Sequence, residues 1–313
     1  MTFPVALGAT IARSDLHDLL GGRLRTRISP SSVTDNVFAF TSPGRPDSRL
    51  DGWTGQDDQH FHFTGEGRPG ADHSDGRGNG ALAGHVAAGR TLHLLRRTGP
   101  GETARYLGTW EVDADLPWVR TDLHNPARPH EPSISVLVFR LRPLNAMTDG
   151  LPTTAAVPVR TVVAEADLYA PFRPHSTHTP RTDTNTIEAA AQRLLRDYRD
   201  HLCNLGDDVR RYQLSLAGTL DQVPVDLMDR SRNEVVAASG SVARFWVLTG
   251  IGELNDIRRH FNPTPGLLLL LPSLPRPDLV DLCSAAHVTI VYPEGHGGFC
   301  RIPPRSAAPA CST

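Results

Sequence analysis

Apolar and polar residues alternate in short segments through the first 143 residues of the chain. The two-residue period that is typical of a β-strand occurs in residues 36–40, 61–63, 91–95, 105–112 and 133–139. Turns that contain Gly and Pro separate these segments, and many short strands between such turns are typical of a closed or nearly closed β-barrel. Two short helices are also predicted, one over 14–20 that ends at Gly21 and Gly22 and one over about 81–88.

A helical period replaces the alternation after residue 186. Helices are predicted over 187–202, 242–260 and 277–286. Strands are predicted over 212–216, 223–227, 234–238, 267–271 and 288–291. The resulting order α-β-β-β-α-β-α-β predicts a small mixed α/β layer domain.

The segment between these two patterns is rich in Pro, Thr and His, which is typical of a semi-extended linker. We therefore expect an α+β protein with a barrel domain over 1–143, a linker over 144–185, an α/β domain over 186–303 and a tail over 304–313. A chain of 313 residues is long enough for two domains that each bury a core.

The charge of the chain limits how it could bind nucleic acid. Its net charge of −2 excludes a protein that is basic over its whole surface, and all 32 Lys and Arg residues are Arg. Contacts to phosphate would therefore come from a local Arg patch, for which the fork of the guanidinium is well suited. The longest apolar run, 266–271, is too short to span a bilayer, and no secretion signal opens the chain, so we expect a cytoplasmic protein with no membrane partner.

One stretch of the barrel half carries the groups needed to read a base rotated out of a DNA duplex. That chemistry requires aromatic faces, a carboxylate that accepts from the cytosine amino group, and backbone amides near phosphate. The predicted base-binding residues are Trp53, Asp57, Asp58, Phe63, Thr64, Gly65, Glu66, Gly67 and Asn79. The alternative is that the aromatic residues are core residues and the two Asp form a solvated turn. His60 and His62 would share one face of a strand, but we expect ordinary histidines and no metal site here.

The run Phe63-Thr64-Gly65-Glu66-Gly67, followed by Gly78-Asn79-Gly80-Ala81-Leu82, resembles the signature of SRA domains. Asp51-Gly52-Trp53 and Phe139-Arg140-Leu141-Arg142-Pro143-Leu144 are similar to the same domain in bacterial modification-dependent endonucleases. The resemblance implies a PUA-like barrel that flips and binds 5-methyl- or 5-hydroxymethylcytosine. Phe63 stands where a Tyr is usual, which keeps a stacking face and loses a hydroxyl.

The second half resembles the restriction-endonuclease-like PD-(D/E)xK fold, whose site is an Asp followed by Glu-x-Lys. Asp226 matches the Asp, whereas Ala237 and Ser239 occupy the Glu and Lys positions. The resemblance thus implies a nuclease domain without two of its three groups and without a metal cofactor. Glu253 could supply a replacement carboxylate, and Asp226 would then bind Mg²⁺. Arg244, Arg258 and Arg259 are the predicted phosphate contacts.

Three hypotheses follow. The first is a DNA-binding protein that recognises modified cytosine in double-stranded DNA by base flipping, acts as a homodimer and has an inactive nuclease domain. The second is an active Mg²⁺-dependent endonuclease that uses Asp226 and Glu253. The third is a scaffold or regulatory protein without base recognition.

Overall fold

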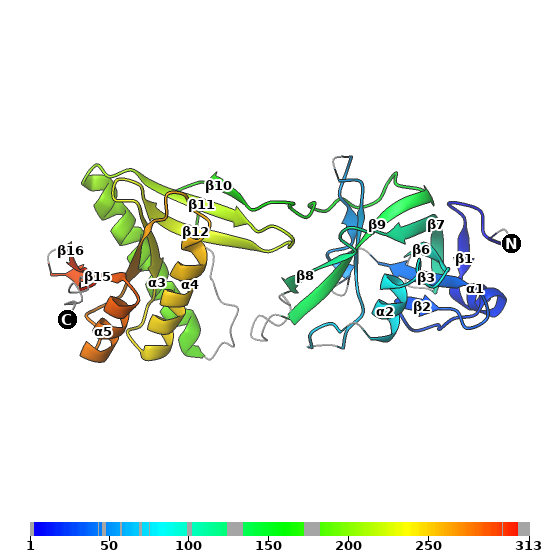
Figure 1. The fold of residues 1–313 in the computed structure, drawn as a ribbon, viewed down its shortest axis with the longest axis horizontal. Helices are drawn as coiled ribbons and strands as arrows, with labels where there is room; N and C mark the ends of the chain where they lie inside the picture. The colour runs from blue at the N-terminus through cyan, green and yellow to red at the C-terminus, as the bar shows by residue number, and fades with distance from the viewer. Residues whose placement is uncertain are drawn as a thin grey trace, which may run out of the picture. The chain divides into compact units, whose positions relative to one another are not determined.

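The structure is a computed structural model. It describes residues 3–42, 44–45, 48–56, 58–68, 71–74, 76–98, 102–123, 134–171, 182–295 and 297–305. The chain divides into two compact units (Figure 1). Unit 1 comprises residues 1–159 with 218–221, and unit 2 comprises 160–217 with 222–313.

Unit 1 is built on one large mixed sheet. Its strands, among the described residues, are β1 (Thr10–Ala12), β2 (Ile28–Pro30), β3 (Asn36–Thr41), β4 (Gly52–Trp53), β5 (Phe61–Thr64), β6 (Thr91–Arg97), β7 (Thr103–Val112), β8 (Trp118–Leu123) and β9 (Ile134–Ala146). They pair in the order β2-β3-β6-β7-β9-β5-β4, with β1 on β7 and β8 on β9. Among the described strands of this sheet, only β3 and β6 pair in parallel. In the part of the chain that is described, β2 and β4 are the two end strands of this hydrogen-bonded order.

Both faces of the unit 1 sheet are covered. One face packs a cluster around Phe61, Phe63, Trp110 and Phe139, all of which are at most 1% exposed. The opposite face of β5 carries His62, which is also buried. Strand β5 consequently has buried residues at all four positions, although its sequence alternates between aromatic and polar residues.

Two helices accompany this sheet. Helix α1 (Arg13–Leu20) lies where a helix was predicted. Helix α2 (Arg77–Ala83) begins about four residues before the predicted helix at 81–88 and ends at Gly84, whose N–H donates to the Gly80 carbonyl. The prediction for the second half of that segment was wrong, because residues 84–89 form turns rather than helix.

The described residues of unit 2 form a seven-stranded sheet between helices. Its elements are β10 (Val162–Ala166), α3 (Thr182–Asn204), β11 (Val209–Ser215), β12 (Gln222–Asp229), β13 (Glu234–Ala238), α4 (Arg244–Arg258), β14 (Gly266–Leu270), α5 (Pro277–Ala285), β15 (Val288–Glu294) and β16 (Gly298–Ile302). The strands pair in sequence order, with parallel pairing of β13, β14 and β15. Alternating residues send Leu268 and Leu270 toward α3, and Leu267 and Leu269 toward α4 and α5. The helices therefore cover both faces of the sheet.

The predicted linker at 144–185 is only partly irregular. Strand β9 continues to Ala146, β10 pairs with β11, and α3 begins at Thr182. The Pro-rich run 172–181 and most of the predicted tail, 306–313, lie outside the described residues. None of the described helices is long and apolar enough to cross a membrane.

Candidate nucleic-acid interface

The turn after β5 is held in shape by one side chain from α2. Asn79 Oδ1 accepts from the Glu66 N–H at 2.8 Å, and its Nδ2 donates to the carbonyls of Glu66 and Ser74, each at 2.7 Å. Asn79 is only 2% exposed. Its amide therefore positions the turn from inside, and the structure does not present it to a base as the sequence predicted.

Close packing explains the glycines of this turn. A Cβ at Gly65 would lie 2.7 Å from Asn79 Oδ1, and one at Gly67 would lie 2.1 Å from the His73 ring. A Cβ at Gly78 would lie 2.4 Å from Glu66 Oε2. The other oxygen of that carboxylate, Oε1, accepts from the Ile28 N–H at 2.7 Å. Glycine at these positions lets the turn, α2 and β2 approach one another.

A second group, Arg27, Asp51 and Phe63, lies next to the turn. Arg27 Nη2 pairs with Asp51 Oδ2 at 2.7 Å, and the Arg27 guanidinium carbon lies 4.7 Å from the centre of the Phe63 ring. Asp51 also accepts from Thr41 Oγ1 at 2.6 Å and from the Thr64 N–H at 2.8 Å. The Asp51 side chain has no exposed surface, and that of Arg27 is 14% exposed.

The predicted stacking residues differ in how they are buried. Phe63 is 0% exposed and belongs to the core, so as the structure stands no face of its ring is open to a base. Trp53 is half-buried at the edge of that core, with its ring centre 6.2 Å from that of Trp110. Stacking by Trp53 remains a prediction, and stacking by Phe63 requires the Arg27 guanidinium to move away from the ring.

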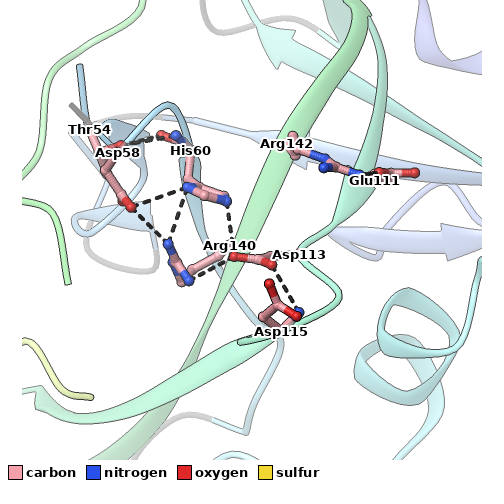
Figure 2. Close-up of polar contacts among 8 residues, drawn as sticks. All are labelled: Thr54, Asp58, His60, Glu111, Asp113, Asp115, Arg140 and Arg142. Carbon is pink, nitrogen blue, oxygen red and sulfur yellow. Dashed lines mark hydrogen bonds and ion pairs between the residues drawn. The ribbon is translucent and has the colours of Figure 1, made fainter. Parts of the chain in front are cut away.

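Of the two carboxylates predicted to accept from a base, the structure describes Asp58 alone. Asp57 is outside the described residues. Asp58 belongs to an ion-pair cluster that Figure 2 shows, in which the Arg140 guanidinium lies between Asp58 and Asp113. The distances are 2.8 Å from Arg140 Nη2 to Asp58 Oδ1 and 2.7 Å from Nη1 to Asp113 Oδ2.

His60 completes this cluster. Its Nε2 lies 3.0 Å from Asp113 Oδ2, its Nδ1 lies 3.3 Å from Asp58 Oδ1, and the four side chains are 9–17% exposed. They join the loop before β5, the segment after β7 and strand β9. Asp58 Oδ1 is thus engaged in a structural contact, whereas the buried Asp58 Oδ2 has no hydrogen-bond partner among the described residues. Burial lowers the pKa of neighbouring His62 to about 4. No group of three His, Cys, Asp or Glu in the described ranges is arranged to hold a metal ion.

The backbone amides of the turn are largely engaged within the protein. The Gly65 N–H donates to the Leu137 carbonyl at 2.8 Å, and the Glu66 N–H donates to Asn79. These two N–H groups are therefore already hydrogen-bonded within the protein, and their contact with phosphate stays a prediction. The side chains that sequence reasoning missed are Asp51 and Arg27. Asp51 was visible only as part of the Asp51-Gly52-Trp53 motif, and no sequence signal joins it to Arg27, 24 residues earlier.

In unit 2, Asp226 is buried and neutralised by an arginine. Asp226 Oδ1 lies 2.9 Å from Arg211 Nη2, and the two side chains are 5% and 8% exposed. Ala237 and Ser239 lie at and just beyond the end of β13, and Ser239 Oγ donates to the Ser241 carbonyl. Glu253 lies on α4 with an interaction of its own. Arg211 thus engages Asp226 Oδ1, and metal binding by Asp226 stays a prediction.

The predicted phosphate contacts all lie on or next to α4. Arg244 is exposed and lies 3.7 Å from Asp278, and Arg259 is exposed and pairs with Asp256 at 2.6 Å. Arg258 is half-buried. Their role toward DNA stays a prediction, since the acidic partners of Arg244 and Arg259 reduce the local positive charge.

Unit 1 is thus a sheet-rich domain with few helices and a glycine turn fixed by an asparagine. Residues 7–161 match the family model described as "ScoMcrA-like, SRA domain". This part of the chain is an SRA domain of the ScoMcrA-like family.

Solved structures with the same kind of domain also match. The sulfur binding and SRA domains of ScoMcrA complexed with phosphorothioated DNA match at 19% identity and a TM-score of 0.35, over 45% of this chain and 40% of that one. The phosphorothioation-dependent restriction endonuclease ScoMcrA matches at 18% and 0.36, over 46% and 29%. The SUVH5 SRA domain in complex with methylated CHH DNA matches at 16% and 0.32, over 46% and 92%. This chain spans less than half of either ScoMcrA chain, and no protein with a curated description matches it.

Proposed function

We propose that unit 1 is a DNA reader that recognises a modified cytosine in double-stranded DNA by rotating the base out of the duplex. The observation that carries the proposal is the group formed by Arg27, Asp51 and Phe63 beside the Gly65-Glu66-Gly67 turn, inside a domain of the SRA family. A flipped base needs an aromatic face and a hydrogen-bond acceptor for its amino group. Phe63 and Asp51 supply these two groups at one place.

Asp51 replaces Asp58 as the proposed acceptor of the cytosine amino group. Asp51 is held by the Thr64 N–H and by Thr41 Oγ1, so its orientation is fixed before any ligand arrives. Asp58 is instead tied to Arg140 and His60. Trp53, half-buried next to β5, is the proposed second aromatic contact.

We further propose that unit 2 does not cleave DNA. Asp226 is paired with Arg211, and the Glu and Lys positions of the nuclease motif are Ala237 and Ser239. Unit 2 would then support binding, through phosphate contacts of Arg244, Arg258 and Arg259 and through homodimer formation. Light scattering of the full chain, with and without duplex, tests the dimer.

The reader hypothesis is tested by a binding panel on the full-length chain. Fluorescence anisotropy compares duplexes that carry one 5-methylcytosine, one 5-hydroxymethylcytosine, one phosphorothioate or no modification, at fixed salt because phosphate contacts make affinity depend on salt. We expect tighter binding to a cytosine-modified duplex than to the unmodified one. Equal affinities across the panel would contradict the reader hypothesis.

Matched variants then identify the acceptor. Asp51→Asn should remove the preference for modified cytosine, because an amide oxygen is a weaker acceptor than a carboxylate and the amide adds a donor. Asp58→Asn should keep the preference. The opposite pattern would restore the assignment made from sequence.

Incubation of methylated plasmid with Mg²⁺ or Mn²⁺ tests whether unit 2 cleaves DNA. If the plasmid is cut and Asp226→Ala abolishes the cutting, the proposal for unit 2 is overturned.

A further inference from the structure

The guanidinium of Arg27 covers the aromatic face and satisfies the carboxylate that the proposed function assigns to a base. It lies 4.7 Å from the Phe63 ring centre and donates to Asp51 Oδ2 at 2.7 Å. Phe63 is 0% exposed with Arg27 in this position. Access of any planar ligand to this face of Phe63 therefore requires Arg27 to leave it.

A guanidinium and the amino edge of cytosine make the same two kinds of contact. Each is planar and can stack on an aromatic ring, and each carries an N–H that donates to a carboxylate. The Arg27 side chain is 14% exposed, so one side of it reaches solvent, whereas Asp51 has no exposed surface. Arg27 is the member of the group that can move outward without opening the core.

The backbone near Arg27 is anchored independently of its side chain. The Phe40 N–H donates to the Arg27 carbonyl at 2.8 Å, and the Ile28 N–H donates to Glu66 Oε1 at 2.7 Å. Two neighbouring contacts thus hold the main chain against β3 and the glycine turn. A change of side-chain rotamer could move the guanidinium while this main chain stays in place.

We propose that Arg27 is an internal substitute for the flipped base, which keeps the site closed until a base bearing an exocyclic amino group replaces it. This inference rests on the proposed function. The exchange selects its ligand, because Asp51 is buried and keeps only the Thr41 hydroxyl and the Thr64 N–H among the donors described here when Arg27 leaves, so a ligand N–H must replace the hydrogen bond that Oδ2 loses. Cytosine and its 5-modified forms bring such a donor at N4, whereas thymine presents a carbonyl at that position.

Removal of the guanidinium should open the site. We expect Arg27→Ala to bind a duplex with one 5-methylcytosine roughly tenfold more tightly than the unchanged chain. When a site is closed in most molecules, its apparent affinity is reduced in proportion to the fraction of molecules in which the site is open. A duplex with thymine at that position should gain nothing. Arg142→Ala is the matched control, because Arg142 is an exposed arginine on β9 of the same unit, and it should bind no more tightly than the unchanged chain.

A second variant covers the case in which Arg27→Ala does not fold. Arg27→Lys keeps a cation for Asp51 and loses the planar group over Phe63, so it should bind 5-methylcytosine duplex more tightly than the unchanged chain, by less than Arg27→Ala. A fluorescent cytosine analogue at the target position should report a larger unstacked fraction with either variant.

The outcomes separate the two proposals. If the unchanged chain shows no preference for modified duplex, the proposed function fails. A second outcome is that the unchanged chain shows the preference but the folded Arg27 variant binds the modified duplex no more tightly than Arg142→Ala does. In that case the reader hypothesis survives, and the proposal that Arg27 occupies the place of the base is overturned.

Discussion

Asn79 and Glu66 exchange two hydrogen bonds, with the Glu66 N–H donating to Asn79 Oδ1 at 2.8 Å and Asn79 Nδ2 donating to the Glu66 carbonyl at 2.7 Å. A side-chain amide can make both bonds because it carries a donor and an acceptor in the geometry of a peptide group. The second N–H of Asn79 reaches the Ser74 carbonyl. This one residue therefore fixes both ends of the loop between β5 and α2.

Asn79→Asp is expected to destabilise unit 1. The carboxylate keeps the size of the amide but loses both donors and faces two carbonyl oxygens, so we expect a loss of about 1–3 kcal/mol in the free energy of unfolding, or more because the site is buried. Urea denaturation followed by tryptophan fluorescence measures it. In a Trp246→Phe background the remaining tryptophans, Trp53, Trp110 and Trp118, all report on unit 1.

The same substitution at an exposed site is the control for Asn79→Asp. Asn145 lies exposed on β9 of unit 1, and Asn145→Asp should leave the unfolding midpoint nearly unchanged. Equal effects at the two positions would contradict the role of Asn79 in the turn.

Gly78→Ala is expected to weaken the contact between α2 and the turn. The added Cβ would lie 2.4 Å from Glu66 Oε2, so Glu66 must move and its bond to the Ile28 N–H must lengthen or break. We expect a loss of about 1–3 kcal/mol, in the range that overpacking usually causes. At Gly76 the nearest atom would lie 3.6 Å away. Gly76→Ala should therefore cost much less in the same denaturation experiment, and a larger cost there would contradict the packing argument.

The sequence located the turn but did not indicate how deeply its side chains are buried. The alternation along 60–63 indicates that His60 and His62 share one face and Phe61 and Phe63 the other. It does not indicate that both faces of β5 are buried. The sequence therefore left open whether Phe63 is a core residue or a base contact, and it offered Asn79 as a base contact. In the structure Phe63 packs in the core and Asn79 fixes the turn.

Contacts between distant residues account for the rest of what could not be predicted. The period of apolar residues was enough to place β13, α4, β14 and α5 to within about two residues, because these elements bury their apolar side directly. Arg27 precedes β2 and Asp51 precedes β4, the two ends of the hydrogen-bonded strand order, so tertiary packing and not strand pairing brings them together. Arg140 reaches Asp58 from a strand about 80 residues later. No local pattern encodes such pairs.

Arg140→Met is expected to destabilise unit 1 more than the loss of an exposed arginine. It would leave the Asp58 and Asp113 carboxylates, 17% and 15% exposed, without the guanidinium that pairs with both and with His60 as their shared partner. Removal of one partner from a largely buried ion pair typically costs about 3–5 kcal/mol. Arg142→Met is the matched control, since Arg142 lies two residues along β9 and its pair with Glu111 is exposed (Figure 2). Similar unfolding midpoints for the two variants would show that the cluster is not a stabilising element.

Stability should fall as the solution becomes acidic, partly through His93. Burial lowers the pKa of His93 to about 4, and its ring bonds to Tyr106 and Asn36 suit the neutral form. The unfolded chain binds this proton near pH 6.5, so the contribution of His93 is present above that pH and is lost as pH falls from about 6.5 to 4. The full loss is on the order of 3 kcal/mol.

The measurement is the free energy of unfolding of unit 1 as a function of pH. His93→Gln removes the titrating group, so its slope between pH 6.5 and 4 should be smaller than that of the unchanged chain. His62, whose pKa is also lowered to about 4, should contribute a slope of the same sign. A stability that rises as the pH falls, or an unaltered slope in His93→Gln, would contradict the assignment.

Asp226 is expected to act as a structural ion-pair partner of Arg211 and not as a metal ligand. The two side chains are 5% and 8% exposed, so Asp226→Ala would leave a buried guanidinium without its carboxylate and should cost about 3–5 kcal/mol. Mg²⁺ should not raise the unfolding temperature of the unchanged chain, since a ligand stabilises only the state that binds it. Asp208→Ala is the control, because the Asp208 pair with Arg210 is exposed and its loss should have a much smaller effect. If Mg²⁺ stabilises the unchanged chain and Asp226→Ala removes that stabilisation, Asp226 binds metal and the nuclease hypothesis regains its support.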